Sequence, residues 1–276
     1  MQQTALEDDF CDIVRKACKG RGVDQNTLAR HTGIEPARIV RLVKGDVPAT
    51  EDEAREIARH LGLDPGKLAD IALGRWKPRP VHAEHVRHHP QEPHPSNGYV
   101  FFLEDGKTAA LVDPAGHARN LLAAVERGPY VLRYILITHK HADHCDATAD
   151  VAAAFPDAQI VMHEADVSAI GDLGARALRV RDGDELPFGN AAAIRMLHTP
   201  GHTDGSSCYL FKATLFSGDT LFAGSVGGAF GERATYDDIL RSVEHKLFNL
   251  DETTVVMPGH GPPTTIGEER LHNPFF

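Results

Sequence analysis

The sequence predicts an α/β domain preceded by a small all-α bundle, and three observations support this fold class. Five short helical patterns fill residues 1–76, strand-like apolar runs alternate with helical patterns in the rest of the chain, and histidines and aspartates stand where several of those runs end. With 276 residues, 42% of them hydrophobic, the chain is long enough for one large and one small domain. We place the bundle at residues 1–76, a Pro/His-rich linker or first strand at 77–95, and the α/β domain at 96–276.

The bundle is expected to contain five helices. Phe10, Ile13, Val14 and Ala17 have the spacing of one helix face, and Thr50 begins a capping box that opens another helix. The expected helices start after Asp8-Asp9 and at Gln25, Pro36, Thr50 and Asp64, and they end at Gly20, His31, Lys44, Leu61 and Gly74.

Residues 5–74 resemble the repressor-type helix-turn-helix family, through Leu28-Ala29, Thr32-Gly33-Ile34, Ile39, Arg41-Leu42, Gly45 and Pro48. The resemblance implies that residues 36–44 enter the DNA major groove, with Arg38 and Arg41 near bases or phosphates. Charge argues against strong binding, because 12 basic and 13 acidic residues leave the bundle at −1. A bundle that serves dimerisation or packs on the α/β domain is the alternative. Since repressor-like bundles often pair, we expect a homodimer.

The composition excludes several classes of protein. Residues 77–276 carry 17 basic and 26 acidic groups, which is not the charge of a nucleic-acid surface. No apolar run approaches the ~20 residues that cross a bilayer, and the first residues lack the order of a signal peptide. We therefore expect a cytoplasmic protein without membrane contact. The four cysteines have no CxxC spacing and are expected to be reduced.

From residue 96 onward, strand and helix patterns alternate, which implies a layered α/β core. Tyr99–Leu103 and Thr108–Val112 flank Asp105-Gly106, a pattern typical of a hairpin. Helices are expected at 118–127, 147–155, after Glu164 and at 236–250, and strands at 131–138, 159–163, 178–180, 186–188, 191–197, 208–212, 214–217 and 254–257. The linker histidines are expected to be solvated or to lie on a strand face: His82, His85, His88, His89 and His94.

The first candidate site is the segment Thr-His-Lys-His-Ala-Asp-His at residues 138–144. It follows the apolar run 131–137, so we expect it at a strand end, where α/β folds often place functional side chains. A loop leaving a strand projects its side chains in different directions. His139 and His141 can therefore face one metal ion while Asp143 and His144 face another. A merely solvated histidine tract is the alternative, which the aspartate inside this spacing disfavours.

Three later turns each offer one further ligand: His202 in Pro-Gly-His-Thr, Asp219 in Ser-Gly-Asp-Thr and His260 in Pro-Gly-His-Gly. The glycine in each turn lets the backbone bend closely around an ion. Together with the His-x-His-x-Asp-His motif, and in the same order, these segments resemble the metallo-β-lactamase superfamily over about residues 95–276. The resemblance implies an αββα sandwich with a dinuclear metal site at one edge.

The resemblance also implies the role of each ligand. One metal would be held by His139, His141 and His202, the second by Asp143, His144 and His260, and Asp219 would bridge the two. Zinc is the expected metal, and the same donors suit iron or manganese. A hydroxide that bridges the ions is the implied nucleophile, with Asp143 and Asp219 as the catalytic residues that position it or relay its proton.

Residues 218–227 and 258–270, followed by Asn273-Pro-Phe, look like the glyoxalase II group, the hydroxyacylglutathione hydrolases. This resemblance implies hydrolysis of a small-molecule thioester, ester or lactone. Gly228-Ala229-Phe230 replaces the Arg-Thr/Ser-Asp of relatives, which favours a bulkier apolar or aromatic substrate over a glutathione thioester. Two alternatives remain: a persulfide dioxygenase with one iron held by two histidines and an aspartate, and a DNA-binding regulator whose metallohydrolase domain senses or removes a metabolite.

Overall fold

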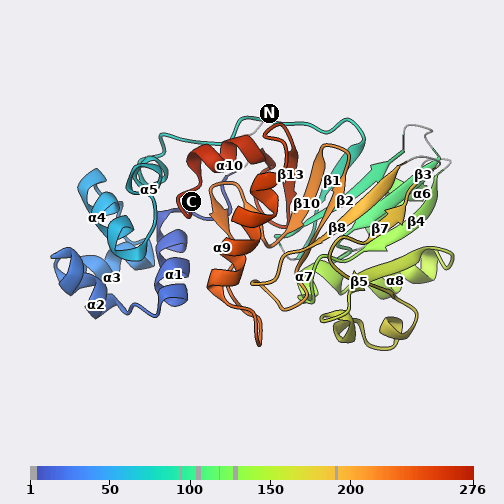
Figure 1. Ribbon diagram of the computed structural model, residues 1–276, viewed down its shortest axis with the longest axis horizontal. Coiled ribbons are helices and arrows are strands. Elements are labelled where there is room, and N and C mark those ends of the chain that lie inside the picture. Colours follow the sequence, from blue (N-terminus) through green and yellow to red (C-terminus); the bar gives the residue numbers. More distant parts are fainter. Residues whose placement is uncertain (1–4, 94, 104–106, 118, 127–129, 190–191) are drawn as a thin grey trace.

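A computed structural model describes residues 5–93, 95–103, 107–117, 119–126, 130–189 and 192–276. It confirms the mixed α/β fold: two six-stranded sheets form a sandwich with helices outside it, and a group of five helices lies at one end (Figure 1). Within the part of the chain that the structure describes, no helix is both long and apolar enough to cross a bilayer.

Five short helices form the N-terminal bundle, as the sequence predicts. An acidic residue or a threonine caps each helix start through its side chain, and glycines in the left-handed conformation end the first four. The helices are α1 (Phe10–Arg21), α2 (Gln25–Thr32), α3 (Pro36–Lys44), α4 (Glu51–Leu61) and α5 (Pro65–Ala72).

The first sheet has the strand order β1-β2-β3-β4-β5-β6. Its first three strands run antiparallel, whereas β3 to β6 are parallel and need helical crossovers between them. The strands are β1 (Val86–Pro90), β2 (Asn97–Phe102), β3 (Thr108–Val112), β4 (Val131–Leu136), β5 (Gln159–His163) and β6 (Leu178–Val180). The helical crossovers are α6 (Arg119–Glu126), then α7 (Ala142–Cys145) with α8 (Thr148–Ala154), then the 3₁₀ helix η1 (Val167–Ala175).

The second sheet has the order β14-β13-β10-β9-β8-β7, with β10 and β13 as its parallel pair. Its strands are β7 (Glu185–Pro187), β8 (Ala193–His198), β9 (Ser207–Phe211), β10 (Thr214–Gly218), β13 (Val255–Pro258) and β14 (Thr264–Thr265). A small hairpin of β11 (Leu221–Phe222) and β12 (Ser225–Val226) follows β10, and α9 (Tyr236–His245), the 3₁₀ helix η2 (Leu247–Asn249) and α10 (Ile266–His272) complete the chain.

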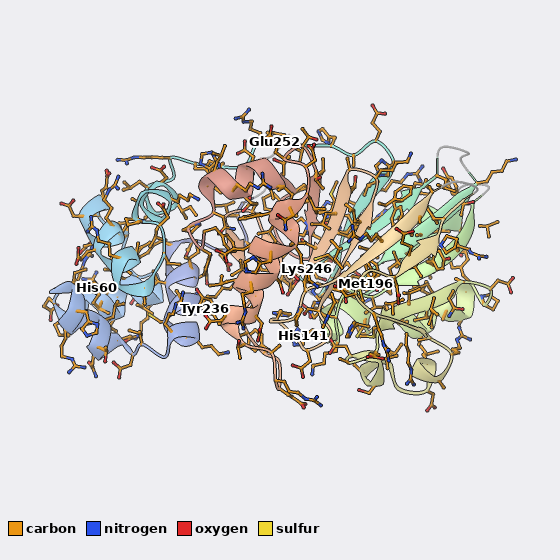
Figure 2. The ribbon with its side chains drawn as sticks, in the orientation of Figure 1. His60, His141, Met196, Tyr236, Lys246 and Glu252 are labelled. Atoms are coloured by element: carbon orange, nitrogen blue, oxygen red, sulfur yellow. The ribbon has the colours of Figure 1, made fainter. Side chains whose placement is uncertain are left out.

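Three apolar layers hold these elements together. One lies between the sheets, where Met196 is fully buried (Figure 2). A second packs α6 and α8 on the first sheet. The third joins the second sheet and α9 to the bundle in one continuous cluster, in which Ile13 of α1 and Ile239 of α9 are both 0% exposed. The bundle therefore shares a hydrophobic core with the sandwich.

Two predicted helices differ from the structure. The helix expected over 236–250 ends at His245, because Lys246 leaves the helix (φ −116°) and its ammonium donates to the His198 carbonyl at 2.6 Å; a short 3₁₀ turn follows. The helix expected after Glu164 is the 3₁₀ helix η1, which is kinked at Gly171 (φ 54°). The linker contains one strand, β1, as allowed above. The expected turn at Asp105-Gly106, and His94, lie outside the described residues.

Candidate metal centre

The seven predicted ligands come from the ends of strands in both sheets. His139 and His141 follow β4, Asp143 and His144 lie in the short helix α7, and the other three follow β8, β10 and β13. Because these strand ends meet at one edge of the sandwich, the structure brings all seven side chains together in three overlapping groups. The groups are His139, His141 and His202; Asp143, His144 and His260; and His139, His144 and Asp219. Within each group the ligand atoms lie within 4.8 Å of one another.

Asp219 lies between the two histidine groups. Its Oδ2 is 3.4 Å from His202 Nε2 and 3.6 Å from His260 Nε2, and its Oδ1 is 3.4 Å from His144 Nε2. The position depends on a glycine, since a Cβ on Gly259 would stand 2.3 Å from Asp219 Oδ1. One carboxylate therefore faces both groups, as a bridging ligand must.

The outer nitrogens of four histidines are already engaged by the protein. The Nδ1 atoms of His202 and His260 face the carbonyls of Gly228 (2.6 Å) and Pro95 (3.0 Å). His144 Nδ1 lies 3.0 Å from Asp113 Oδ2, and His139 Nδ1 lies 3.0 Å from Thr138 Oγ1. These contacts leave Nε2 of all four rings toward the centre, which is the usual way in which a protein orients metal-binding histidines.

The donor set fits divalent cations. Among the described residues, His139 Nε2 and Asp219 Oδ1 are buried without a hydrogen-bond partner, a costly state that a metal ion relieves. Burial lowers the pKa of His202 to about 4 and holds that of His139 well below its usual range. Both rings are therefore neutral, as metal ligands need to be. The hydrogen bond to His260 is the main factor that keeps the pKa of Asp143 below its usual range, so this carboxylate is ionised.

Two buried aspartates that the sequence did not single out hold the ligand loops. Asp113 is 1% exposed and accepts from the amide and hydroxyl of Thr138, each at 2.7 Å, besides its contact with His144. Asp166 accepts from the amides of Lys140 and Gly205, both at 3.1 Å, and from the hydroxyl of Thr203. One joins the end of β3 to the His-x-His loop, and the other joins that loop to the turn of His202. The position of Asp113 directly after a buried strand was the available signal.

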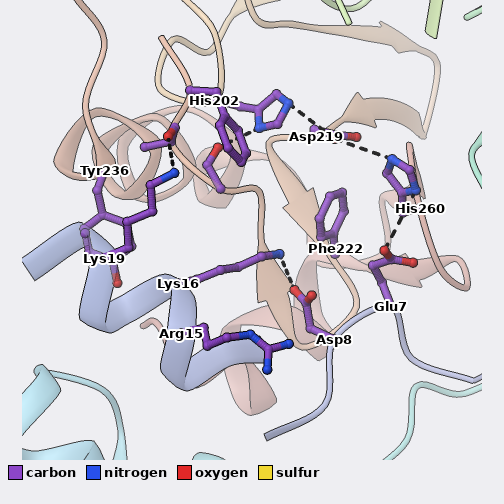
Figure 3. Close-up of a pocket in the computed structure, with 14 residues that line it drawn as sticks. Glu7, Asp8, Arg15, Lys16, Lys19, His202, Asp219, Phe222, Tyr236 and His260 are labelled. Carbon is purple, nitrogen blue, oxygen red and sulfur yellow. Dashed lines mark hydrogen bonds and ion pairs between the residues drawn. The ribbon is translucent and has the colours of Figure 1, made fainter. Parts of the chain in front are cut away.

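A cavity of about 420 Å³ opens over the centre (Figure 3). Its lining includes the ligands His202, Asp219 and His260, the rings of Phe222 and Phe230, and residues of the N-terminal segment and α1. Phe230 is 57% exposed, and its ring centroid lies 5.5 Å from that of His202. The small, apolar segment 228–230 therefore forms part of the pocket.

The two arginines proposed to contact DNA differ in their surroundings. Arg38 is half-buried, donates to both carboxylate oxygens of Glu53 at 2.8 Å and also donates to the Pro48 carbonyl at 2.8 Å. Arg41 is exposed on α3. A role for either residue in binding DNA stays a prediction, and Arg38 would have to leave Glu53 to take part.

Three further residues near the ligand loops have structural contacts. His198 stacks on His163 with ring centroids 3.9 Å apart, and its Nε2 lies 2.9 Å from the Asp204 carbonyl. Cys145 is buried, and its Sγ lies 3.6 Å from the Lys140 carbonyl. Burial raises the pKa of Cys145 to about 12, so it is a thiol that packs against the loop.

Comparisons with known proteins agree with this geometry. A family model described as the metallo-beta-lactamase superfamily matches residues 93–260. The hydroxyacylglutathione hydrolase GloC of Haemophilus influenzae is 31% identical over 190 residues, which cover 63% of this chain and 89% of that protein. The solved structure of BLEG-1 B3 metallo-beta-lactamase is 32% identical with a TM-score of 0.60, covering 69% of this chain and 98% of that one. The structure of ETHE1 from Myxococcus xanthus is 30% identical with a TM-score of 0.61, covering 68% and 83%.

Proposed function

The chain belongs to the metallo-β-lactamase superfamily, and from this premise we propose that it is a hydrolase that cleaves a thioester, ester or lactone with two divalent cations. The observation that carries the proposal is the presence of two three-residue ligand groups with the carboxylate of Asp219 between them. Similarity to a hydroxyacylglutathione hydrolase supports the thioester part. Zinc is the expected metal, with iron or manganese as alternatives, because histidine and carboxylate donors suit all three.

Bound at this centre, two divalent cations would supply hydroxide near neutral pH and polarise the substrate carbonyl. Side chains of the protein would hold the metal site together, orient the reacting groups and line the cavity. Asp219, which lines the cavity, fixes the two histidine groups relative to each other. Asp143 is ionised and 30% exposed, so a carboxylate oxygen can accept a hydrogen bond from the attacking water and orient it. Phe222 and Phe230 give the cavity part of its apolar lining.

Metal analysis of the purified protein, followed by activity assays on a panel of thioesters, lactones and phosphodiesters, tests the proposal. We expect two metal ions per chain, turnover of thioesters or lactones, and loss of both metal and activity in Asp219→Ala. Asp157→Ala is the matched control, because it removes an exposed carboxylate that belongs to none of the ligand groups. Two bound metals without hydrolysis of any thioester, ester or lactone would contradict the proposal.

A second candidate is the persulfide dioxygenase with a single iron. The group His139, His144 and Asp219 consists of two histidines and one carboxylate, a donor set that binds iron(II) in oxygenases. One iron per chain, together with oxygen consumption on a persulfide, would favour it. Hydrolysis remains our first proposal because the residues Asp143 and His260 complete a second group that a single iron does not need.

A further inference from the structure

One wall of the cavity over the metal centre comes from the N-terminal part of the chain. Glu7 and Asp8 precede α1, and Lys16 and Lys19 lie on it, yet all four line the same cavity as the ligand Asp219 (Figure 3). The bundle is thus part of the pocket, although none of its residues belongs to the ligand groups described above.

Helix α1 is fixed in this position by contacts with the sandwich. Lys16 Nζ donates to the Val226 carbonyl of β12 at 2.8 Å. Gly20 lies directly against the ring of Tyr236 in α9, where a Cβ would come within 2.3 Å of the ring carbon Cγ. A Cβ on Gly261, next to the ligand His260, would stand 3.0 Å from Glu7. The wall therefore has a defined place beside the catalytic residues.

The charges on this wall are unevenly matched. Lys16 pairs with Asp8, and Arg15 pairs with Asp12 and donates to the Val43 carbonyl at 2.8 Å, so both cations are compensated. Lys19 has no carboxylate partner among the residues that the structure describes. Its Nζ lies 3.4 Å from the Ala229 carbonyl and 4.1 Å from the centre of the Phe230 ring.

Among the described residues of this wall, Lys19, the cation without a carboxylate partner, and Glu7, the carboxylate not paired with a lysine or arginine, lie at different ends of the cavity. Glu7 Oε1 is 3.9 Å from His260 Nδ1, at one side of the metal centre. Lys19 is at the other side, since the Phe230 ring that it contacts is 5.5 Å from the ring of His202. The Lys19 ammonium therefore lies no more than 9.6 Å from the His202 ring, the sum of 4.1 and 5.5 Å. A chain of about six carbon atoms that ends in a carboxylate about 2.8 Å from the ammonium spans such a distance.

We propose that Lys19 and the ring of Phe230 form a subsite for an anionic group of the substrate, so that the preferred substrates are thioesters or esters in which a short apolar segment separates a carboxylate from the scissile carbonyl. The apolar segment would lie on Phe230 and the carboxylate would meet the ammonium of Lys19. This inference rests on the proposed hydrolase function and names its substrate class. It also gives the bundle a role in substrate recognition.

Three matched thioesters test the subsite and show which end carries the charge. S-hexanoyl-N-acetylcysteamine is neutral, S-adipoyl-N-acetylcysteamine has a carboxylate on the acyl group, and S-hexanoyl-3-mercaptopropionate has one on the thiol. We expect one anionic probe to exceed the neutral probe about fivefold in kcat/KM, as suits a solvent-exposed ion pair. Lys19→Gln should bring the ratio close to one and Lys19→Glu below one, whereas Lys44→Gln, an exposed lysine on α3, should leave it unchanged. Raising NaCl to about 0.5 M should also reduce the ratio.

Equal rates for all three probes in the wild-type enzyme, or a preference that survives Lys19→Gln, would overturn the subsite while leaving hydrolysis intact. Hydrolysis of none of the probes would count against the proposed function instead. In that case the affinities of the three ketone analogues, which have CH₂ in place of the thioester sulfur, can be measured by calorimetry and still test whether the subsite binds an anionic group. Tighter binding of an anionic ketone that Lys19→Gln abolishes would support it, and equal binding of all three ketones would refute it.

Discussion

Asp113→Asn should weaken one metal site selectively. The asparagine keeps the shape of the side chain and tolerates the positive φ of 52° at this position, so the backbone is not disturbed. The asparagine oxygen is expected to stay with the Thr138 amide, because that backbone donor cannot turn away. The NH₂ group then faces the Thr138 hydroxyl, which can rotate to accept from it, and the Nδ1–H of His144, which loses its acceptor. An unsatisfied buried donor costs about 1–3 kcal/mol, and the loss of such a support typically lowers metal affinity about 10- to 100-fold.

The assay is stepwise removal of metal by a chelator, followed by metal counting and by urea unfolding of each form. We expect the metal at Asp143, His144 and His260 to leave Asp113→Asn at a chelator concentration about 10- to 100-fold lower than in the wild type, before the metal at His139, His141 and His202. Asp150→Asn, on the exposed face of α8, is the control for charge alone. Unchanged chelator sensitivity, or equal loss of both metals, would refute the role given to Asp113.

Three other predictions concern a buried carboxyl group, a glycine beside the ligands and an exposed arginine. Burial raises the pKa of Glu269 from 4.5 to about 7. The protonated Glu269 therefore stabilises the fold fully below about pH 4.5, and the free energy of unfolding falls by about 3 kcal/mol as the pH rises to about 7. Urea unfolding at several pH values should show a smaller pH dependence in Glu269→Gln, and an unchanged pH dependence would contradict the prediction. Gly259→Ala should abolish metal binding with the fold retained by circular dichroism, because its Cβ would stand 2.7 Å from His144 Cε1, whereas Gly66→Ala in α5 should bind metal normally. If the bundle binds DNA, Arg41→Ala should lower the salt-dependent retention on DNA and reduce its slope by about one, while no retention of the wild type at low salt would contradict DNA binding.

The sequence singled out the seven residues that cluster at the candidate metal centre, but not the aspartates that support their loops. His202, Asp219 and His260 each stand beside a glycine in a turn at a strand end, so their role is visible within a few residues of chain. Asp113 and Asp166 act on partners 25 and 37 residues away. The position of Asp113 after a buried strand is a local signal, but it does not show which loop the carboxylate holds. The helix ends at Asp9, Thr50 and Gly62 were predictable for the same reason, because capping is local.

The position of α1 could not be predicted from local sequence either. Its amphipathic face and caps were predictable, but the contact of Lys16 with Val226 spans 210 residues and depends on how the whole bundle packs on the second sheet. Resemblance to a DNA-binding bundle drew attention to α3, whereas the structure places α1 at the cavity over the candidate metal centre. The apolar cluster that joins Ile13 to Ile239 means that moving the bundle away would expose a continuous core. A regulator that needs a mobile DNA-binding domain would have to break this interface, but an enzyme that uses α1 to recognise its substrate depends on the interface remaining closed.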